Sequence, residues 1–177
     1  MQARRQLVVF YSRSGFTRLL ARALAEGLGA DLEELKDTRK RSGLIGYLRC
    51  GWESTFQRLT PLQPISVEPK DYDLVLVGTP VWNAGVSSPV RSFLVHHGVR
   101  CKNVAFFCTY GGSGSERAFR QMAAACGKAP VATLAVRDKE INGPVQRDRI
   151  AQLTRQLEAA AARSLTGAAS RAERQND

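Results

Sequence analysis

Apolar residues follow two alternating patterns along this chain. Short unbroken runs, such as Leu7–Tyr11 and Val104–Cys108, have the length and composition of buried strands. Between them lie longer segments in which apolar residues recur every three or four positions, as on one face of a helix. The expected strands cover residues 7–11, 30–35, 73–78, 104–108 and 130–136, and the helical patterns begin near residues 16, 90, 118 and 150. This alternation predicts an α/β protein with five strands in a parallel sheet and helices on both faces.

The first expected strand ends in a loop suited to an anion. Residues Ser12–Thr17, of sequence SRSGFT, follow the strand directly, and the helical pattern starts at Phe16. The first N–H groups of a helix have no partner within the helix and carry the positive end of its dipole. Three hydroxyl groups and Gly15 surround this point, so the loop predicts a site for a phosphate monoester.

The phosphate loops of two common nucleotide-binding folds are absent. The chain has no G-x-x-x-x-G-K-[ST] sequence, so it lacks the lysine and the Mg²⁺-binding hydroxyl of a P-loop nucleotidase. It also has no G-x-G-x-x-G followed by an acidic residue about twenty positions later, which disfavours a dinucleotide pyrophosphate. By itself, the loop at 12–17 has two interpretations, a phosphate site and a simple capped turn.

Two further strands also end in loops rich in small residues and aromatics. Residues Thr79–Pro89 follow the strand at 73–78, and residues Thr109–Gly114 follow the strand at 104–108. In an open parallel sheet, ligands bind outside the carboxyl ends of the strands, where the strand order reverses. We therefore expect three loops to converge there, one holding a phosphate and two enclosing a flat ring.

These three segments resemble the FMN-binding loops of the flavodoxin-like superfamily. The matching segments are Ser12–Thr17, Gly78–Gly85 and Thr109–Gly114, in the order and spacing of a short-chain member. The resemblance covers about residues 6–165. It implies a three-layer sandwich whose five parallel strands have the order 2-1-3-4-5, with FMN as the cofactor.

The resemblance also assigns roles to residues. It implies that Ser12, Ser14, Gly15 and Thr17 hold the FMN phosphate, with backbone N–H groups from Arg13 and Phe16. It places Pro80, Val81, Trp82 and Asn83 along the isoalloxazine, with Trp82 as the stacking ring. It places Thr109, Tyr110, Gly111, Gly112 and Gly114 over the pyrimidine edge of the flavin. For Trp82 and Tyr110, packing in the protein core is the alternative.

Length and composition predict one domain, residues 1–167. The last helical pattern is expected to stop near Gly167, and residues 168–177 have no apolar period, so we expect a disordered tail there. No apolar run approaches the ~20 residues that span a bilayer, and the chain opens with no signal-peptide pattern. Its four cysteines have no metal-ligand spacing and are expected to be reduced thiols. We therefore expect a cytoplasmic protein without stable membrane insertion.

The segment Lys36–Lys70 is longer than a crossover helix and its loops require. Apolar residues from Leu44 to Leu59 fall near one helical face, which predicts a crossover helix packed on the sheet. The alternative is that the start of this segment, or Trp52, reaches the flavin edge or a twofold partner, as in a homodimer.

The chain is strongly basic, with a formal net charge of +10. Residues 36–58 contain six basic side chains and two acidic ones. No helix-turn-helix, RNA-recognition or zinc motif accompanies this charge, so nucleic acid is not the expected partner. A solvated face, an acidic membrane surface and the extra phosphate of NADPH on Arg39 or Arg41 are the alternatives for this stretch.

Side chains able to carry catalysis themselves are scarce. The sequence has no paired carboxylates, no nucleophile motif and no metal-ligand set, and its two histidines, His96 and His97, end a predicted helix, where a capping role is expected. A bound flavin would supply the chemistry, with no catalytic side chain and no metal. A basic surface stabilises the anion of reduced flavin, which favours hydride chemistry. We expect an oxidoreductase that moves electrons from NAD(P)H to a quinone or similar acceptor. The alternatives are a one-electron carrier serving a protein partner and a non-catalytic FMN-binding module.

Overall fold

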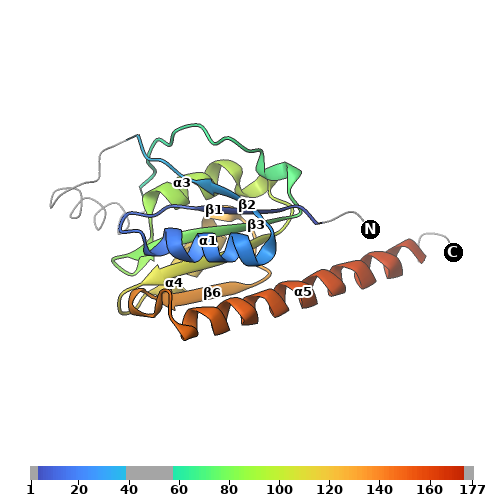
Figure 1. Cartoon of the computed structure of the whole chain (residues 1–177). Helices are drawn as coiled ribbons and strands as arrows, with labels where there is room; N and C mark the ends of the chain where they lie inside the picture. The colour runs from blue at the N-terminus through green and yellow to red at the C-terminus, as the bar shows by residue number, and fades with distance from the viewer. Residues whose placement is uncertain (1–3, 39–57, 174–177) are drawn as a thin grey trace.

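The computed structural model describes residues 4–38 and 58–173, with side chains described up to residue 162. Strands and helices alternate along the chain (Figure 1). The strands are β1 (Gln6–Phe10), β2 (Asp31–Glu34), β3 (Leu74–Trp82), β4 (Gly85–Val86), β5 (Val104–Tyr110) and β6 (Thr133–Arg137). The helices are α1 (Phe16–Leu28), α3 (Ser88–His97), α4 (Ser115–Cys126) and α5 (Pro144–Glu173), with short 3-10 turns at Pro69–Asp71, Gly98–Arg100 and Asp138–Glu140.

Five strands form a parallel sheet in the order β2-β1-β3-β5-β6. The two-residue strand β4 lies outside this order and pairs antiparallel with the end of β3. If β4 is set aside, the order is the expected 2-1-3-4-5, so the predicted flavodoxin-like architecture is confirmed. Strand β2, of sequence DLEE, falls within the strand expected at residues 30–35 and is an edge strand of this sheet.

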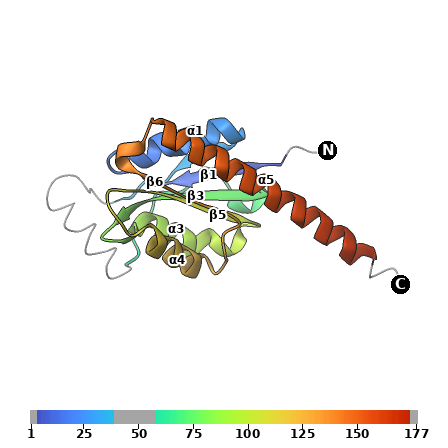
Figure 2. The ribbon, with the colours of Figure 1, turned by 90° about the horizontal axis from the view of Figure 1, so that it is seen from below.

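The sheet is buried on both faces. Along β1, Leu7 and Val9 point into one apolar core, whereas Val8 and Phe10 point into the other. Helices α1 and α5 cover one face, and α3 and α4 cover the opposite face (Figure 2). Because successive side chains of a strand alternate between faces, an unbroken apolar run is what a doubly covered sheet requires.

Two strands continue further than expected. Strand β3 runs to Trp82 and β5 runs to Tyr110, whereas the sequence suggested ends at residues 78 and 108. The end of β3 turns back on itself through Asn83 and Ala84 and pairs with β4. Val81 and Trp82 pair with β4, whereas Thr79 and Pro80 pair with β5, so Pro80, Val81 and Trp82 lie on a strand end and not in a loop.

The last helix is longer than expected. Helix α5 passes through Gly167 and ends at Glu173, so residues 168–173 of the predicted disordered tail are helical, and the prediction of a helix end near Gly167 is wrong. A single glycine inside a helix costs only about 1 kcal/mol relative to alanine, so it does not by itself end a helix. The second half of α5 extends beyond the sheet (Figure 1). Residues 174–177 lie outside the described residues.

The connection between β2 and β3 is described only at its two ends. Asp37 forms an antiparallel bridge with Leu62, and the Gln63 N–H donates to the Lys36 carbonyl (2.9 Å). The predicted crossover helix lies almost wholly in residues 39–57, which are outside the described residues. Trp52, Arg39 and Arg41 lie in the same range. Its expected last residue, Leu59, is exposed and not helical.

Candidate functional site

The loop after β1 leads directly into α1 through a left-handed glycine. Gly15 has φ 98° and is the N-cap of α1. Its N–H donates to Ser12 Oγ (3.1 Å), so the buried Ser12 hydroxyl shapes the loop itself. Arg13, Ser14 and Phe16 are exposed. The predicted loop is therefore formed, with Ser12 as an internal brace and Ser14 facing outward.

The first turn of α1 is open to an anion. No side chain caps it, and no acidic residue lies in it. A Cβ placed on Gly15 would meet no atom within 4 Å, so the backbone at this point is uncovered. Free N–H groups at the positive end of a helix, without a competing carboxylate, are the arrangement that binds a phosphate.

The first and third loops are joined by a hydrogen bond between two buried hydroxyls. Thr17 Oγ1 lies 2.8 Å from Thr109 Oγ1, and either atom can donate. Thr17 is 1% exposed and Thr109 is 2% exposed. The second residue of α1 is thus tied to the carboxyl end of β5.

The second loop is a tight hairpin. Asn83 (φ 44°) and Ala84 (φ 58°) are its two central residues, and positive φ at both positions is the geometry of a type I′ turn. Trp82 meets Tyr11 edge to face, with ring centroids 5.5 Å apart, which orients the half-buried indole beside the first loop. The returning strand is held by α4, since the Val86 N–H donates to Gln121 Oε1 (2.9 Å).

The third loop touches the second. Gly114 (φ 101°) caps α4, and a Cβ placed on it would lie 2.5 Å from Ala84 Cα. Only glycine permits this approach. Tyr110 is half-buried at the end of β5, and Gly111 and Gly112 are exposed. With the Thr17–Thr109 bond, all three predicted loops are brought together at one edge of the sheet.

Asp138 is a site-edge residue that the sequence did not single out. It directly follows β6, and its Oδ2 lies 3.8 Å from where a Cβ on Gly111 would stand. Burial raises the pKa of Asp138 above its usual range. The sequence could have indicated Asp138 through its position just after the fifth main strand, because ligands bind at the carboxyl edge of such sheets.

Cys108 and the histidine pair lie outside the three loops. Cys108 is fully buried, and burial is the main cause of its strongly raised pKa, with smaller contributions from Glu116 and Asp138. His96 and His97 lie in the last turn of α3, as expected. Burial, then Arg100 and His96, lower the pKa of His97, and the Arg100 guanidinium lies 2.7 Å from its Nδ1. Within residues 4–38 and 58–173, no three His, Cys, Asp or Glu side chains are placed to share a metal ion, and no helix has the length and apolarity to cross a membrane.

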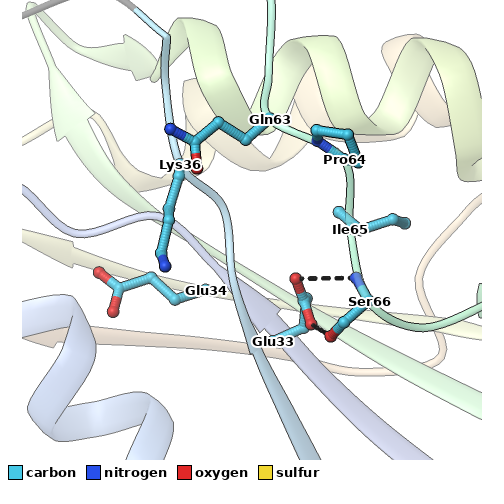
Figure 3. Close-up of a pocket in the computed structure, with 7 residues that line it drawn as sticks. All are labelled: Glu33, Glu34, Lys36, Gln63, Pro64, Ile65 and Ser66. Carbon is cyan, nitrogen blue, oxygen red and sulfur yellow. Dashed lines mark hydrogen bonds between the residues drawn. The ribbon is translucent and has the colours of Figure 1, made fainter.

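A separate hollow lies against the end of β2 (Figure 3). It has a volume of about 390 Å³ and is lined by Glu33, Glu34, Lys36, Gln63, Pro64, Ile65 and Ser66. Its carboxylates are already engaged: Glu33 accepts from the N–H and the hydroxyl of Ser66, and Glu34 pairs with Arg18. Two carboxylates would repel a phosphate, so this hollow does not compete with the three loops as an anion site.

The residues present fit FMN. An uncapped helix N-terminus with hydroxyl groups suits a dianionic phosphate, and two half-buried aromatic side chains, Trp82 and Tyr110, stand at the ends of the neighbouring strands β3 and β5. The backbone of Gly15 and Gly112 is uncovered. Such a site takes a flat ring with a phosphate tail.

A family comparison matches most of the chain. The model of the NADPH-dependent FMN reductase family matches residues 7–141, which include all three loops and Asp138. A comparison with curated protein sequences gives no significant match.

The fold is shared with solved flavoproteins. The chain is similar to a flavoprotein from Lactobacillus acidophilus solved in complex with FMN, with 21% identity, a TM-score of 0.67, and coverage of 79% of this chain and 97% of that one. A flavoprotein from Bacteroides eggerthii has 19% identity and a TM-score of 0.70, with 89% and 98% covered. A WrbA-like flavodoxin from Agrobacterium tumefaciens has 15% identity and a TM-score of 0.55, with 90% and 98% covered.

Proposed function

The chain belongs to the family of NADPH-dependent FMN reductases, and from this premise we propose that it is an FMN-dependent oxidoreductase. It takes electrons from NAD(P)H and delivers them to a quinone or a similar small acceptor. The observation that carries the proposal is the contact among the three loops. Thr17 bonds Thr109, and Gly114 packs on Ala84, at the sheet edge where α1 presents an uncapped N-terminus.

We assign the binding of the phosphate to the first loop. Ser12 folds the loop through the Gly15 N–H, which leaves the next amides of α1 and the hydroxyls of Ser14 and Thr17 to face the phosphate. Neutral donors and a helix dipole hold a dianion without a metal. The backbone N–H groups of Arg13 and Phe16 belong to the same set.

We assign the binding of the ring to the other two loops. Pro80, Val81, Trp82 and Asn83 come from β3 and its hairpin, and Thr109, Tyr110, Gly111, Gly112 and Gly114 come from β5 and its loop. The Tyr11 contact fixes the orientation of Trp82. Aromatic side chains fixed in this way bind a flat ring with little loss of entropy.

The side chains bind and orient, and bound FMN supplies hydride acceptance and electron release. The protein residues exclude water from one face of the ring and hold the donor against it. Because FMN would supply the redox chemistry, the site does not require a paired acid and base.

The test combines a spectrum with an assay. The purified protein is expected to bind FMN and to oxidise NADPH with menadione faster than the same concentration of free FMN. Thr17→Val is expected to lose FMN, whereas Thr133→Val, at the exposed opposite end of the sheet, keeps both FMN and activity. A colourless protein that does not quench FMN fluorescence would refute the proposal.

One observation favours a second candidate, a one-electron carrier for a protein partner. The negative charges of Glu116 and Asp138 contribute to the raised pKa of Cys108 near the carboxyl end of β5, so negative charge lies close to the third loop. Negative charge near the ring disfavours the anion of fully reduced flavin. FMN binding without NADPH turnover, together with electron transfer from a separate reductase to a protein acceptor, would assign the chain to this class.

A further inference from the structure

Asp138 stands beside the third loop, at the end of the neighbouring strand. Strands β5 and β6 run parallel with Tyr110 opposite Arg137, so the next residues along them are Gly111 and Asp138. The Oδ2 atom of Asp138 lies 3.8 Å from the point where a Cβ on Gly111 would stand. The carboxylate therefore adjoins the backbone of a loop that we assign to the flavin ring.

The Asp138 carboxylate lacks a partner in the described part of the chain. No hydrogen bond or ion pair joins it to residues 4–38 or 58–162. The residue is half-buried, and burial raises the pKa of its carboxyl. Burial of a carboxylate is costly unless a donor compensates it. Because part of the residue remains exposed, a donor from outside the chain can reach it.

The ring of oxidised FMN presents one N–H group among several acceptors. Its atoms O2, O4, N1 and N5 accept hydrogen bonds, and only N3 carries a hydrogen. Backbone N–H groups of the third loop suit the ring oxygens, but the N3–H needs an acceptor. A donor that leaves water on binding and finds no acceptor weakens the binding.

We propose that the Asp138 carboxylate accepts the hydrogen bond from the N3–H of bound flavin. The inference rests on the proposed function, because it takes FMN as the ligand of the three loops. The backbone carbonyls of Gly111 and Gly112 are weaker candidates, since both residues are exposed and water can pair with them. A hydrogen bond to a charged acceptor is also about twice as strong as one between neutral groups. Asp138 is thereby a specificity residue for a ring with a free N3–H.

The binding test compares FMN with 3-methyl-FMN, in which a methyl group replaces the N3 hydrogen. The wild type is expected to bind FMN about tenfold more tightly than the methylated analogue. Asp138→Ala should bind FMN about tenfold more weakly than the wild type does, and it should bind the two ligands about equally. The double difference isolates the contact between residue 138 and N3 from any other effect of either change.

Two further variants serve as controls. Asp138→Asn keeps an oxygen that can accept, so it should retain a preference for FMN of about threefold, because a neutral acceptor makes a weaker bond. Asp148→Ala removes an exposed carboxylate of α5 and should change neither affinity. If methylation weakened binding equally in the wild type and in Asp138→Ala, the N3–H would have another acceptor and the proposal would be wrong.

A spectroscopic measurement covers the case in which Asp138→Ala does not fold. In proton NMR spectra of bound FMN, the N3–H signal is expected to lie downfield of its position in free FMN and to exchange slowly with water. In Asp138→Asn the signal should move back upfield. An N3 proton that exchanges as fast as in free FMN, or a signal unchanged in Asp138→Asn, would overturn the proposal.

The two proposals can fail separately. A protein that shows this preference for FMN but does not oxidise NADPH would support the role of Asp138 and refute the proposed function. A protein that binds neither FMN nor its methylated analogue would refute both.

Discussion

Thr17 and Thr109 share a hydrogen bond of 2.8 Å across 92 residues of sequence. Each hydroxyl carries one proton. If Thr17 donates its proton to the flavin phosphate, Thr109 must donate to Thr17. The pair would thus let the third loop, to which we assign the ring, orient a hydroxyl of the first loop, to which we assign the phosphate.

Thr109→Val is expected to weaken FMN binding about fivefold to tenfold, because Thr17 loses the donor that orients its own proton. Riboflavin, which has the ring but no phosphate, should bind the variant and the wild type equally. Fluorescence titration with both ligands measures the difference, and Thr109→Ser, which keeps the hydroxyl, is the control. An equal loss for both ligands would show that Thr109 acts on the ring and not through Thr17.

Gly114→Ala is expected to destabilise the protein by about 1–3 kcal/mol and to weaken FMN binding. The new Cβ would stand 2.5 Å from Ala84 Cα, and the backbone there has φ 101°. The steric clash pushes the second loop away from the third, and the positive φ adds backbone strain for alanine. Urea unfolding measures the loss, with Gly112→Ala as the control, because a Cβ at Gly112 meets no atom within 4 Å. Similar stabilities of the two variants would contradict the close approach.

Ala84→Gly is expected to stabilise the free protein by up to about 1 kcal/mol. Ala84 has φ 58° at the second central position of the hairpin, where Asn-Gly is the preferred pair and alanine is strained. Chemical denaturation of the two proteins without flavin measures the change. A loss of stability would mean that relief of strain at Ala84 is smaller than the added entropy of the unfolded chain.

Asp138→Asn is expected to change how stability depends on pH. Burial raises the pKa of Asp138 in the folded state above its reference value of 3.8, so the folded protein favours the protonated carboxyl. Relative to Asp138→Asn, the wild type should be most stable below pH 3.8 and should lose stability as pH rises through the raised pKa. Denaturation from acid to neutral pH measures the slope. Asp148→Asn removes an exposed carboxylate as the control, and a wild type that gained relative stability toward neutral pH would contradict the effect of burial.

The three central strands β1, β3 and β5 could be predicted because each is an apolar run that both faces of the sheet bury. Val75, Leu76 and Val77 are fully buried, as an uninterrupted run predicts. The position of the first loop could also be predicted, because Gly15 and the hydroxyl residues lie between an apolar strand and a helical pattern. The segments that we propose to bind the ring came from the resemblance to flavodoxin-like proteins, and the family match over residues 7–141 includes them.

Other features depend on partners distant in sequence. The extension of β3 to Trp82 needs β4, and the position of β4 needs Gln121 of α4. The lowered pKa of His97 comes from its burial and from Arg100 and His96. No local pattern in the sequence marks Asp138 as half-buried, or Ser88 Oγ as an atom without a hydrogen-bond partner among the described residues.

The sequence by itself determined the alternation of strands and helices and the hydroxyl- and glycine-rich composition of the loop at residues 12–17. Periodicity and turn residues act over a few neighbouring positions, so they can be read without knowledge of the fold. Only the tertiary structure decided that Thr17 meets Thr109, that Gly114 meets Ala84, and that Ser88 Oγ and Arg91 Nε are buried without a hydrogen-bond partner in the described part of the chain. These relationships arise when the strand order brings distant segments to one edge of the sheet, and close packing then fixes which atoms touch.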